Sequence, residues 1–218
     1  MKTLWPCLGM LLSLPALAAL LEFSGTPAKR ISASGMEVPV FEKAKVSLDQ
    51  SEREVFLTGA GIRTKSILKV NVYVAISYVD LPQGLPARDA MEGVRKSKTR
   101  AIQLTFLRDV KAKQIRSSFA DALEANGVEI ETSPVKEVLE ALTFDLREKS
   151  NLTVVSFEKS PEDEVLLLET AERKMRFTGK NLGFSFWKIW FGKPADRGLE
   201  TLREALLSPG VPLSKKMN

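Results

Sequence analysis

The chain has 218 residues, a formal net charge of +5 and no histidine. Without histidine it cannot form a Ser-His-Asp triad or a histidine metal site, and no phosphate-binding G-x-x-x-x-G-K-[ST] motif is present, so we expect no cofactor and no metal. Basic and acidic residues are interleaved along the chain, which argues against a nucleic-acid-binding face.

The first eighteen residues resemble a secretory signal. Lys2 supplies the positive start, residues 8–18 form a short apolar run, and Ala16-Leu17-Ala18 is a small-residue cleavage pattern. The run is shorter than the about 20 residues that span a bilayer. We therefore expect cleavage after Ala18 and a periplasmic or secreted mature protein with no membrane span. An uncleaved N-terminal anchor is the alternative.

The mature chain would hold about 200 residues without the single cysteine, Cys7, so its stability must come from a hydrophobic core. Its length suits one domain. We expect a lead-in over residues 19–34, one domain over residues 35–212 and a short tail over residues 213–218.

The first part of the domain is predicted to form strands. Residues 38–46 and 54–57 indicate short strands, and Gly59-Ala60-Gly61 indicates a turn where the backbone can approach another group closely. Residues 67–79 are rich in Val, Ile and Tyr, which is typical of a strand.

Alternation along residues 67–79 assigns its side chains to two faces. The face expected to line a cleft carries Asn71, Tyr73, Ala75 and Ser77. The face expected in the core carries Val70, Val72, Val74 and Ile76. Arg63 on the preceding segment can then face Tyr73 across neighbouring strands, and this pair could hold a carboxylate or a polarised carbonyl.

The rest of the chain predicts helices and strands in blocks. Helices are expected over residues 86–97, 111–126, 135–148 and 195–207. Strands are expected over residues 100–107, 151–158, 164–170 and 174–178, and an aromatic segment over residues 184–191. In the second helix the apolar stripe is Ile115, Phe119, Ala122 and Leu123. This order predicts an α+β fold with an antiparallel sheet.

Three segments together resemble the chalcone isomerase-like family. They are Leu57-Thr58-Gly59-Ala60-Gly61-Ile62-Arg63 running into Val72-Tyr73-Val74-Ala75, then Leu104-Thr105-Phe106-Leu107-Arg108-Asp109-Val110, and residues 184–192 followed by Lys193-Pro194-Ala195-Asp196. The resemblance implies an open-faced β-sandwich, in which a large antiparallel sheet packs with a layer of helices and a ligand cleft lies between them.

The resemblance also implies two alternative functions. In the plant enzymes of the family an arginine assists ring closure of a chalcone, with threonine, tyrosine, lysine and asparagine completing the site. In the non-catalytic fatty-acid-binding relatives an arginine and a tyrosine hold a carboxylate. Arg63 matches the arginine of both branches, and Tyr73 matches the tyrosine of the fatty-acid binders.

Departures from the enzymes favour the binding branch. The second segment and the helix after it lack the enzyme's tyrosine, and the threonine expected near Tyr73 is missing. We therefore expect an exported, non-catalytic binder of a fatty acid or similar amphipathic carboxylate, with ligand contacts from Arg63, Tyr73, Asn71 and Arg108. If the protein is instead an isomerase or intramolecular lyase acting on an enone, Arg63, Tyr73 and Lys113 are the candidate catalytic residues. A structural or partner-binding envelope protein is a third possibility.

Two groups of candidates have a plainer interpretation. Arg108 could form a local ion pair with Asp109, which would then cap the next helix, instead of lying at the cleft mouth. The aromatic segment could line a lipid tunnel, but its density of aromatic residues favours the hydrophobic core. This segment contains Phe184, Phe186, Trp187, Trp190 and Phe191.

Overall fold

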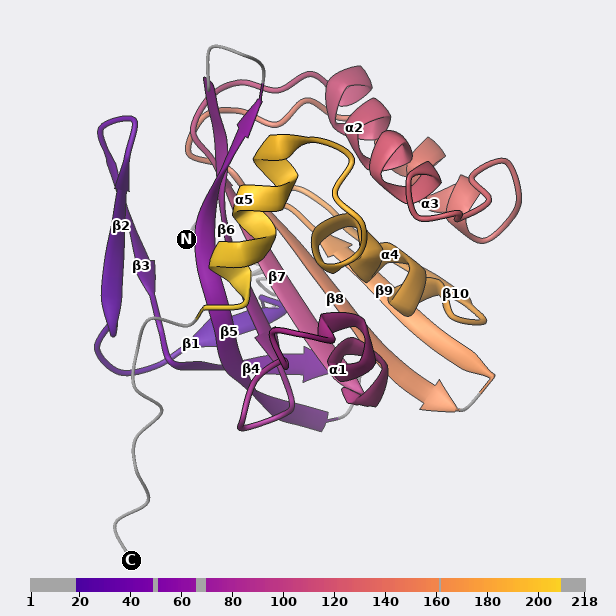
Figure 1. The fold of residues 1–218 in the computed structure, drawn as a ribbon, viewed down its shortest axis with the longest axis horizontal. Coiled ribbons are helices and arrows are strands. Elements are labelled where there is room, and N and C mark those ends of the chain that lie inside the picture. Colours follow the sequence, from indigo (N-terminus) through magenta and orange to yellow (C-terminus); the bar gives the residue numbers. More distant parts are fainter. Residues whose placement is uncertain (1–18, 49–50, 66–69, 161, 209–218) are drawn as a thin grey trace, which may run out of the picture.

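Eight strands form one antiparallel sheet in the order β1-β4-β5-β6-β7-β8-β9-β10 (Figure 1). The computed structural model describes residues 19–48, 51–65, 70–160 and 162–208, so the predicted signal lies outside the described residues. The strands are β1 (Leu21–Phe23), β4 (Lys43–Leu48), β5 (Ser51–Lys65), β6 (Val70–Val79), β7 (Thr99–Phe106), β8 (Asn151–Ser160), β9 (Asp163–Glu169) and β10 (Lys174–Gly179). A separate hairpin pairs β2 (Lys29–Ala33) with β3 (Met36–Val40).

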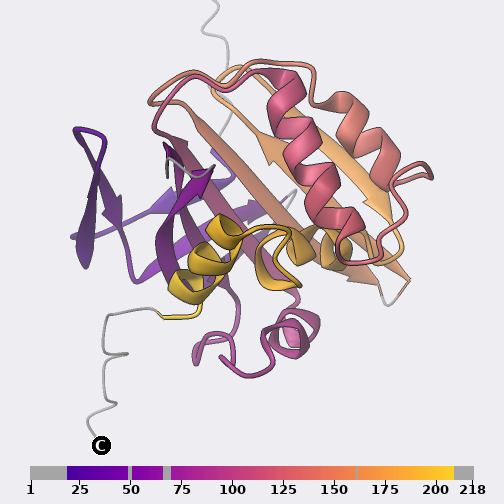
Figure 2. The same ribbon diagram turned by 45° about the horizontal axis from the view of Figure 1, so that its top comes forward.

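The helices pack on one face of this sheet, and the β2–β3 hairpin stands to its side (Figure 2). They are α1 (Ala90–Lys96), α2 (Ala112–Glu124), α3 (Val135–Ala141), α4 (Leu182–Phe191) and α5 (Arg197–Leu206). The predicted α+β open-faced sandwich, with a large antiparallel sheet and a layer of helices, is confirmed. No helix among the described residues is long and apolar enough to cross a membrane.

Both faces of the sheet are buried, because the helices cover one and the curled N-terminal strands with the hairpin cover the other. Tyr73 and Ala75 belong to the helix-side core, whereas Val74, Ile76 and Tyr78 belong to the core on the opposite side. The predicted core face is therefore confirmed at Val74 and Ile76, but the predicted cleft face is wrong at Ala75 and Ser77, which are fully buried. Residues 67–69 of that prediction lie outside the described residues.

The glycines at positions 59 and 61 lie inside a strand, so the predicted turn is wrong. β5 runs without interruption through both glycines, and its part from Phe56 to Lys65 pairs with β6. A Cβ at Gly61 would lie 2.5 Å from the Cβ of Ala205, and one at Gly59 would lie 2.5 Å from the carbonyl oxygen of Leu206. The glycines thus allow α5 to lie directly on β5, which is the close approach that glycine permits.

Helix α2 confirms the helical periodicity read from the sequence, since Ile115, Phe119, Ala122 and Leu123 are its buried residues. The helix predicted over residues 135–148 is too long. Its second half leaves the helix because the backbone of Leu146 exchanges hydrogen bonds of 2.7 and 2.8 Å with Val110. The residues of the predicted lead-in include β1 and β2, and the strand predicted over residues 38–46 is divided between β3 and β4.

The aromatic segment forms α4 and fills the helix-side core, as the plainer interpretation predicted. Trp187 and Trp190 are fully enclosed, and their rings pack edge-to-face with centroids 5.9 Å apart. A buried ion pair ties this helix to the sheet: Arg100 on β7 donates to Glu164 on β9 at 2.9 Å, and Glu164 also accepts the backbone N–H of Phe184 at 2.8 Å.

Candidate functional site

Arg63 and Tyr73 lie directly opposite each other on β5 and β6. A bulge follows at once, because Thr64 pairs with Asn71 and leaves Val72 as an extra residue on β6. The bulge shifts the alternation of side chains, so Val72 turns toward the same side as Tyr73. Arg63 and Tyr73 are both buried, with 2% and 4% of their surfaces exposed.

The guanidinium group of Arg63 is engaged by a carboxylate of the chain itself. Its two terminal nitrogens donate to the two carboxylate oxygens of Asp196 at 2.9 and 2.5 Å, and one of them also donates to the carbonyl oxygen of Thr64. Asp196 is the N-cap of α5 and accepts the backbone N–H of Leu199 at 2.9 Å. The Asp196 side chain thus both caps α5 and forms a bidentate ion pair with Arg63.

Two opposing effects set the pKa of Asp196. Partial burial acts to raise it, but the hydrogen bonds from Arg63 and from the backbone of α5 outweigh that effect and hold the pKa below its usual value. The group is therefore an anion at neutral pH and forms a neutral pair with Arg63.

Tyr73 keeps its proton. Burial raises the pKa of its hydroxyl, although the nearby Arg63 guanidinium and the indole N–H of Trp190 act in the opposite direction. A neutral phenol can donate one hydrogen bond, and the Arg63 guanidinium beside it is a donor that cannot accept one. Its O–H is thus left to donate toward the adjacent cavity.

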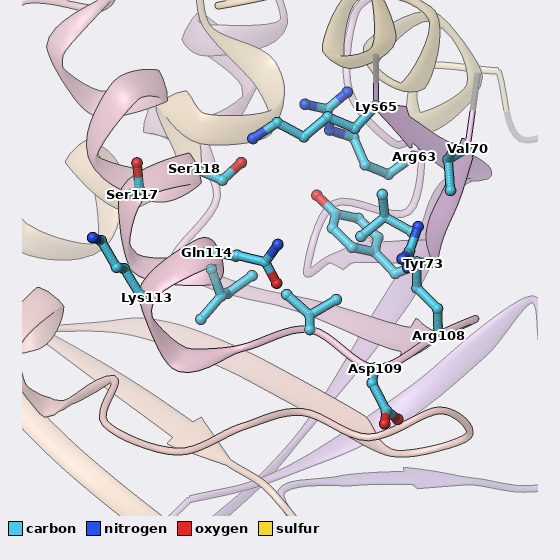
Figure 3. Close-up of a pocket in the computed structure, with 13 residues that line it drawn as sticks. Arg63, Lys65, Val70, Tyr73, Arg108, Asp109, Lys113, Gln114, Ser117 and Ser118 are labelled. Carbon is cyan, nitrogen blue, oxygen red and sulfur yellow. The ribbon is translucent and has the colours of Figure 1, made fainter. Parts of the chain in front are cut away.

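A half-open cavity of about 420 Å³ lies between the β5–β6 bulge and α2 (Figure 3). The strands contribute Arg63, Lys65, Val70, Val72 and Tyr73 to its wall. The loop after β7 and the first turns of α2 contribute Arg108, Asp109, Val110, Lys113, Gln114, Ile115, Ser117 and Ser118. The volume is within the range of about 300–1,000 Å³ that is usual for small-molecule sites.

Four of the residues expected from the sequence line this cavity, and one does not. Arg63, Tyr73, Arg108 and Lys113 are part of its wall. Asn71 lies elsewhere, because its amide donates to the Ser34 hydroxyl in the β2–β3 turn at 3.3 Å.

The expected cap of α2 by Asp109 is wrong. Asp109 accepts the backbone N–H of Glu148 at 2.9 Å, and it is Asp145 that accepts the N–H of Ala112 at the start of α2, at 3.0 Å. No ion pair joins Arg108 to Asp109 in the described part of the chain, so Arg108 remains a free cation at the cavity mouth.

Sequence reasoning missed four residues of the site: Lys65, Gln114, Ser118 and Asp196. Lys65 is two positions after Arg63 on the same strand, and Gln114 and Ser118 are four apart on α2, so simple periodicity could have grouped them. Asp196 had no comparable signal beyond its position at the start of a predicted helix, because its partner is 133 residues away.

The cavity mouth carries more positive than negative charge. Lys65, Arg108 and Lys113 have no carboxylate within ion-pair distance among the described residues, and Asp109 is the one acid among the residues that line the cavity. The floor between these groups is aliphatic and includes Val72 and Ile115. The arrangement combines an apolar wall with hydrogen-bond donors and cations.

A comparison with curated proteins gives no match. The model of the chalcone isomerase-like family matches residues 40–208, which is most of the chain and includes β5, β6, α2 and α5. The matched range contains every residue that lines the cavity and also Asp196. By this match and by its fold, the chain belongs to the chalcone isomerase-like family.

Proposed function

We propose that the protein is a non-catalytic binder of a fatty acid or similar amphipathic carboxylate. The observation that carries the proposal is the half-open cavity of about 420 Å³, in which an aliphatic wall is bordered by cations without ion-pair partners. An acyl chain would cover Val70, Val72, Val110 and Ile115, and its acid group would meet the donors around Tyr73.

The two ends of such a ligand would contribute differently to binding. Each methylene removed from water contributes about 0.8 kcal/mol, so the acyl chain would supply most of the affinity. Hydrogen bonds to a charged group contribute about 1.5–3 kcal/mol each and are directional, so the polar end would fix the orientation.

The protonation states around the cavity favour binding over isomerase chemistry. A proton-transfer mechanism needs a group that can take up a proton near neutral pH. Tyr73 keeps its proton because burial raises its pKa, Asp196 is held by Arg63, and the Asp109 carboxylate accepts the N–H of Glu148. The Tyr73 hydroxyl can polarise a carbonyl, but no group beside it in the described part of the chain is placed to act as the base.

Export is part of the proposal. Leu20 and Leu21 are buried, and β1 starts at Leu21, so the residues directly after the predicted cleavage site at Ala18 belong to the fold. Cleavage at that site would leave these core residues in the mature chain. Intact-mass analysis of the protein from a periplasmic extract should give a chain that starts at Ala19, and a mass that includes Met1–Ala18 would contradict the proposal.

Native mass spectrometry of the purified protein, followed by titration with hexadecanoate, tests the binding function. We expect a co-purified acid or saturable binding, and loss of both in Ser118→Trp, which fills the cavity from α2. Ser32→Trp makes the same change on the exposed face of the β2–β3 hairpin and should bind as the wild type does. If the wild type neither carries nor binds an acid, the proposal fails. Turnover of chalcones or other enones above background would then favour the isomerase.

A further inference from the structure

The arginine that the sequence points to is not the group best able to receive an external carboxylate. Arg63 already donates to both oxygens of Asp196 and to the carbonyl oxygen of Thr64, and it is almost completely buried. A ligand could form a bidentate pair with the two terminal nitrogens of this guanidinium only by displacing Asp196, which would also remove the N-cap of α5. The acid group of a ligand therefore needs other partners.

Four other groups converge on the cavity and offer hydrogen-bond donors. In Figure 3 the Tyr73 hydroxyl and the Lys65 ammonium point into the space in front of α2, toward Gln114 and Ser118. The Oε1 of Gln114 accepts the backbone N–H of Lys111 at 3.0 Å, so its amide N–H₂ is left to donate. Gln114 and Ser118 are one helical turn apart and thus present neighbouring side chains.

Lys65 differs from Lys113 in the direction of its side chain. Its ammonium extends across the cavity, whereas the Lys113 side chain leaves α2 away from the cavity (Figure 3). Lys65 also has no carboxylate within ion-pair distance among the residues that the structure describes. A charged donor surrounded by neutral donors suits a group that only accepts hydrogen bonds and carries negative charge.

We infer that Lys65, with Gln114, Ser118 and the Tyr73 hydroxyl, binds the acid group of the ligand. Asp196 directs the acid group to these residues by holding the Arg63 guanidinium in an ion pair. The inference rests on the proposed binding function and assigns its polar contacts. It implies a ligand with a carboxylate or a similar anionic oxygen group at one end, since an uncharged alcohol would leave Lys65 without a counter-ion. Arg63 then acts as a positioning residue for Tyr73.

Titration calorimetry with hexadecanoate and with hexadecanol separates these roles. Lys65→Met should weaken hexadecanoate binding on the order of tenfold and leave hexadecanol binding unchanged, because only the charge-assisted contact is lost. Lys98→Met is the matched control and should change neither affinity by more than about twofold, since Lys98 is exposed and does not line the cavity, and exposed charges are screened. Equal effects of the two lysine variants on hexadecanoate binding would overturn the inference.

Asp196→Asn tests the second half of the inference. Asparagine keeps the helix cap but releases the Arg63 guanidinium, so hexadecanoate should bind more tightly and the effect of Lys65→Met should shrink in this background. Unchanged affinity would show that Asp196 does not determine specificity.

If wild-type protein binds hexadecanoate and Ser118→Trp abolishes binding, but Lys65→Met binds like the wild type, the binding function stands and the assignment of Lys65 is wrong. No hexadecanoate binding by the wild type contradicts the binding function itself.

Discussion

Arg63 on β5 and Asp196 at the start of α5 form a bidentate ion pair between residues 133 positions apart in the chain. The arginine is buried, whereas 43% of the Asp196 side chain is exposed. The pair attaches the beginning of the last helix to the strand that borders the cavity. The same contact thus supports the fold and decides which donors remain for a ligand.

Asp196→Asn should lower the free energy of unfolding by about 1–2 kcal/mol. The substitution keeps a good N-cap but removes the charge that faces a buried guanidinium. The expected loss is below the value for a fully buried pair because solvent reaches Asp196. Urea denaturation of the wild type and the variant would measure the difference.

Glu54→Gln is a suitable control for that measurement. It removes the negative partner of Lys43 at 2.7 Å, but both side chains of this pair are about half exposed. No measurable change is expected there. Equal destabilisation by the two substitutions would show that burial of Arg63 adds nothing to its ion pair.

The contribution of Asp196 to stability should disappear in acid. The pKa of Asp196 is lowered in the folded protein from 3.8, the ordinary value that applies in the unfolded chain. The unfolded state therefore takes up the proton first as pH falls, and the stabilisation is complete above about pH 4 and lost as pH falls through the lowered pKa. Denaturation of the wild type and Asp196→Asn at pH 6 and pH 2 would follow the difference between them. A difference that persists unchanged at pH 2 would contradict this origin.

Gly61→Ala and Gly59→Ala should both destabilise the protein, but for different reasons. The new Cβ at position 61 meets the Ala205 side chain, whereas the one at position 59 meets the backbone of α5. Such overpacking costs about 1–3 kcal/mol. Adding Ala205→Gly should therefore recover a part of the stability lost in Gly61→Ala and none of that lost in Gly59→Ala. Thermal unfolding of the four variants would measure this, and equal rescue would argue against a strand-on-helix contact at Gly59.

Neither tyrosine should ionise near pH 10 in the folded protein. Tyr73 and Tyr78 are the only two tyrosines in the chain, and burial raises the pKa of both above 10.0. In the unfolded chain both should titrate near pH 10, so the unfolded state loses protons first and stability should fall as pH rises past this value. Ultraviolet absorbance of phenolate, followed in native buffer and in urea, gives the two titrations. A native transition near pH 10 would place a tyrosine in solvent.

Local pattern predicted most of the secondary structure because each pattern reflects which residues face the core. The stripe of Ile115, Phe119, Ala122 and Leu123 identified α2, alternation identified β7, and short apolar segments identified the β8–β9–β10 meander. The local pattern failed at Gly59 and Gly61, where glycine does not form a turn but allows α5, which is distant in sequence, to pack against the strand. It also failed along β6, where a core on each side of the sheet makes both faces apolar.

The sequence by itself determined the α+β class, most of the helices and strands, and the candidate pair Arg63 and Tyr73, since these depend on residue type and short-range spacing. Only the tertiary structure decided that Arg63 forms an ion pair with Asp196 and that Lys65, Gln114 and Ser118 share a cavity with Tyr73. The physical reason is that an ion pair and a cavity depend on distances between elements. Those distances are set by the packing of α5 and α2 on the sheet, which no local pattern encodes.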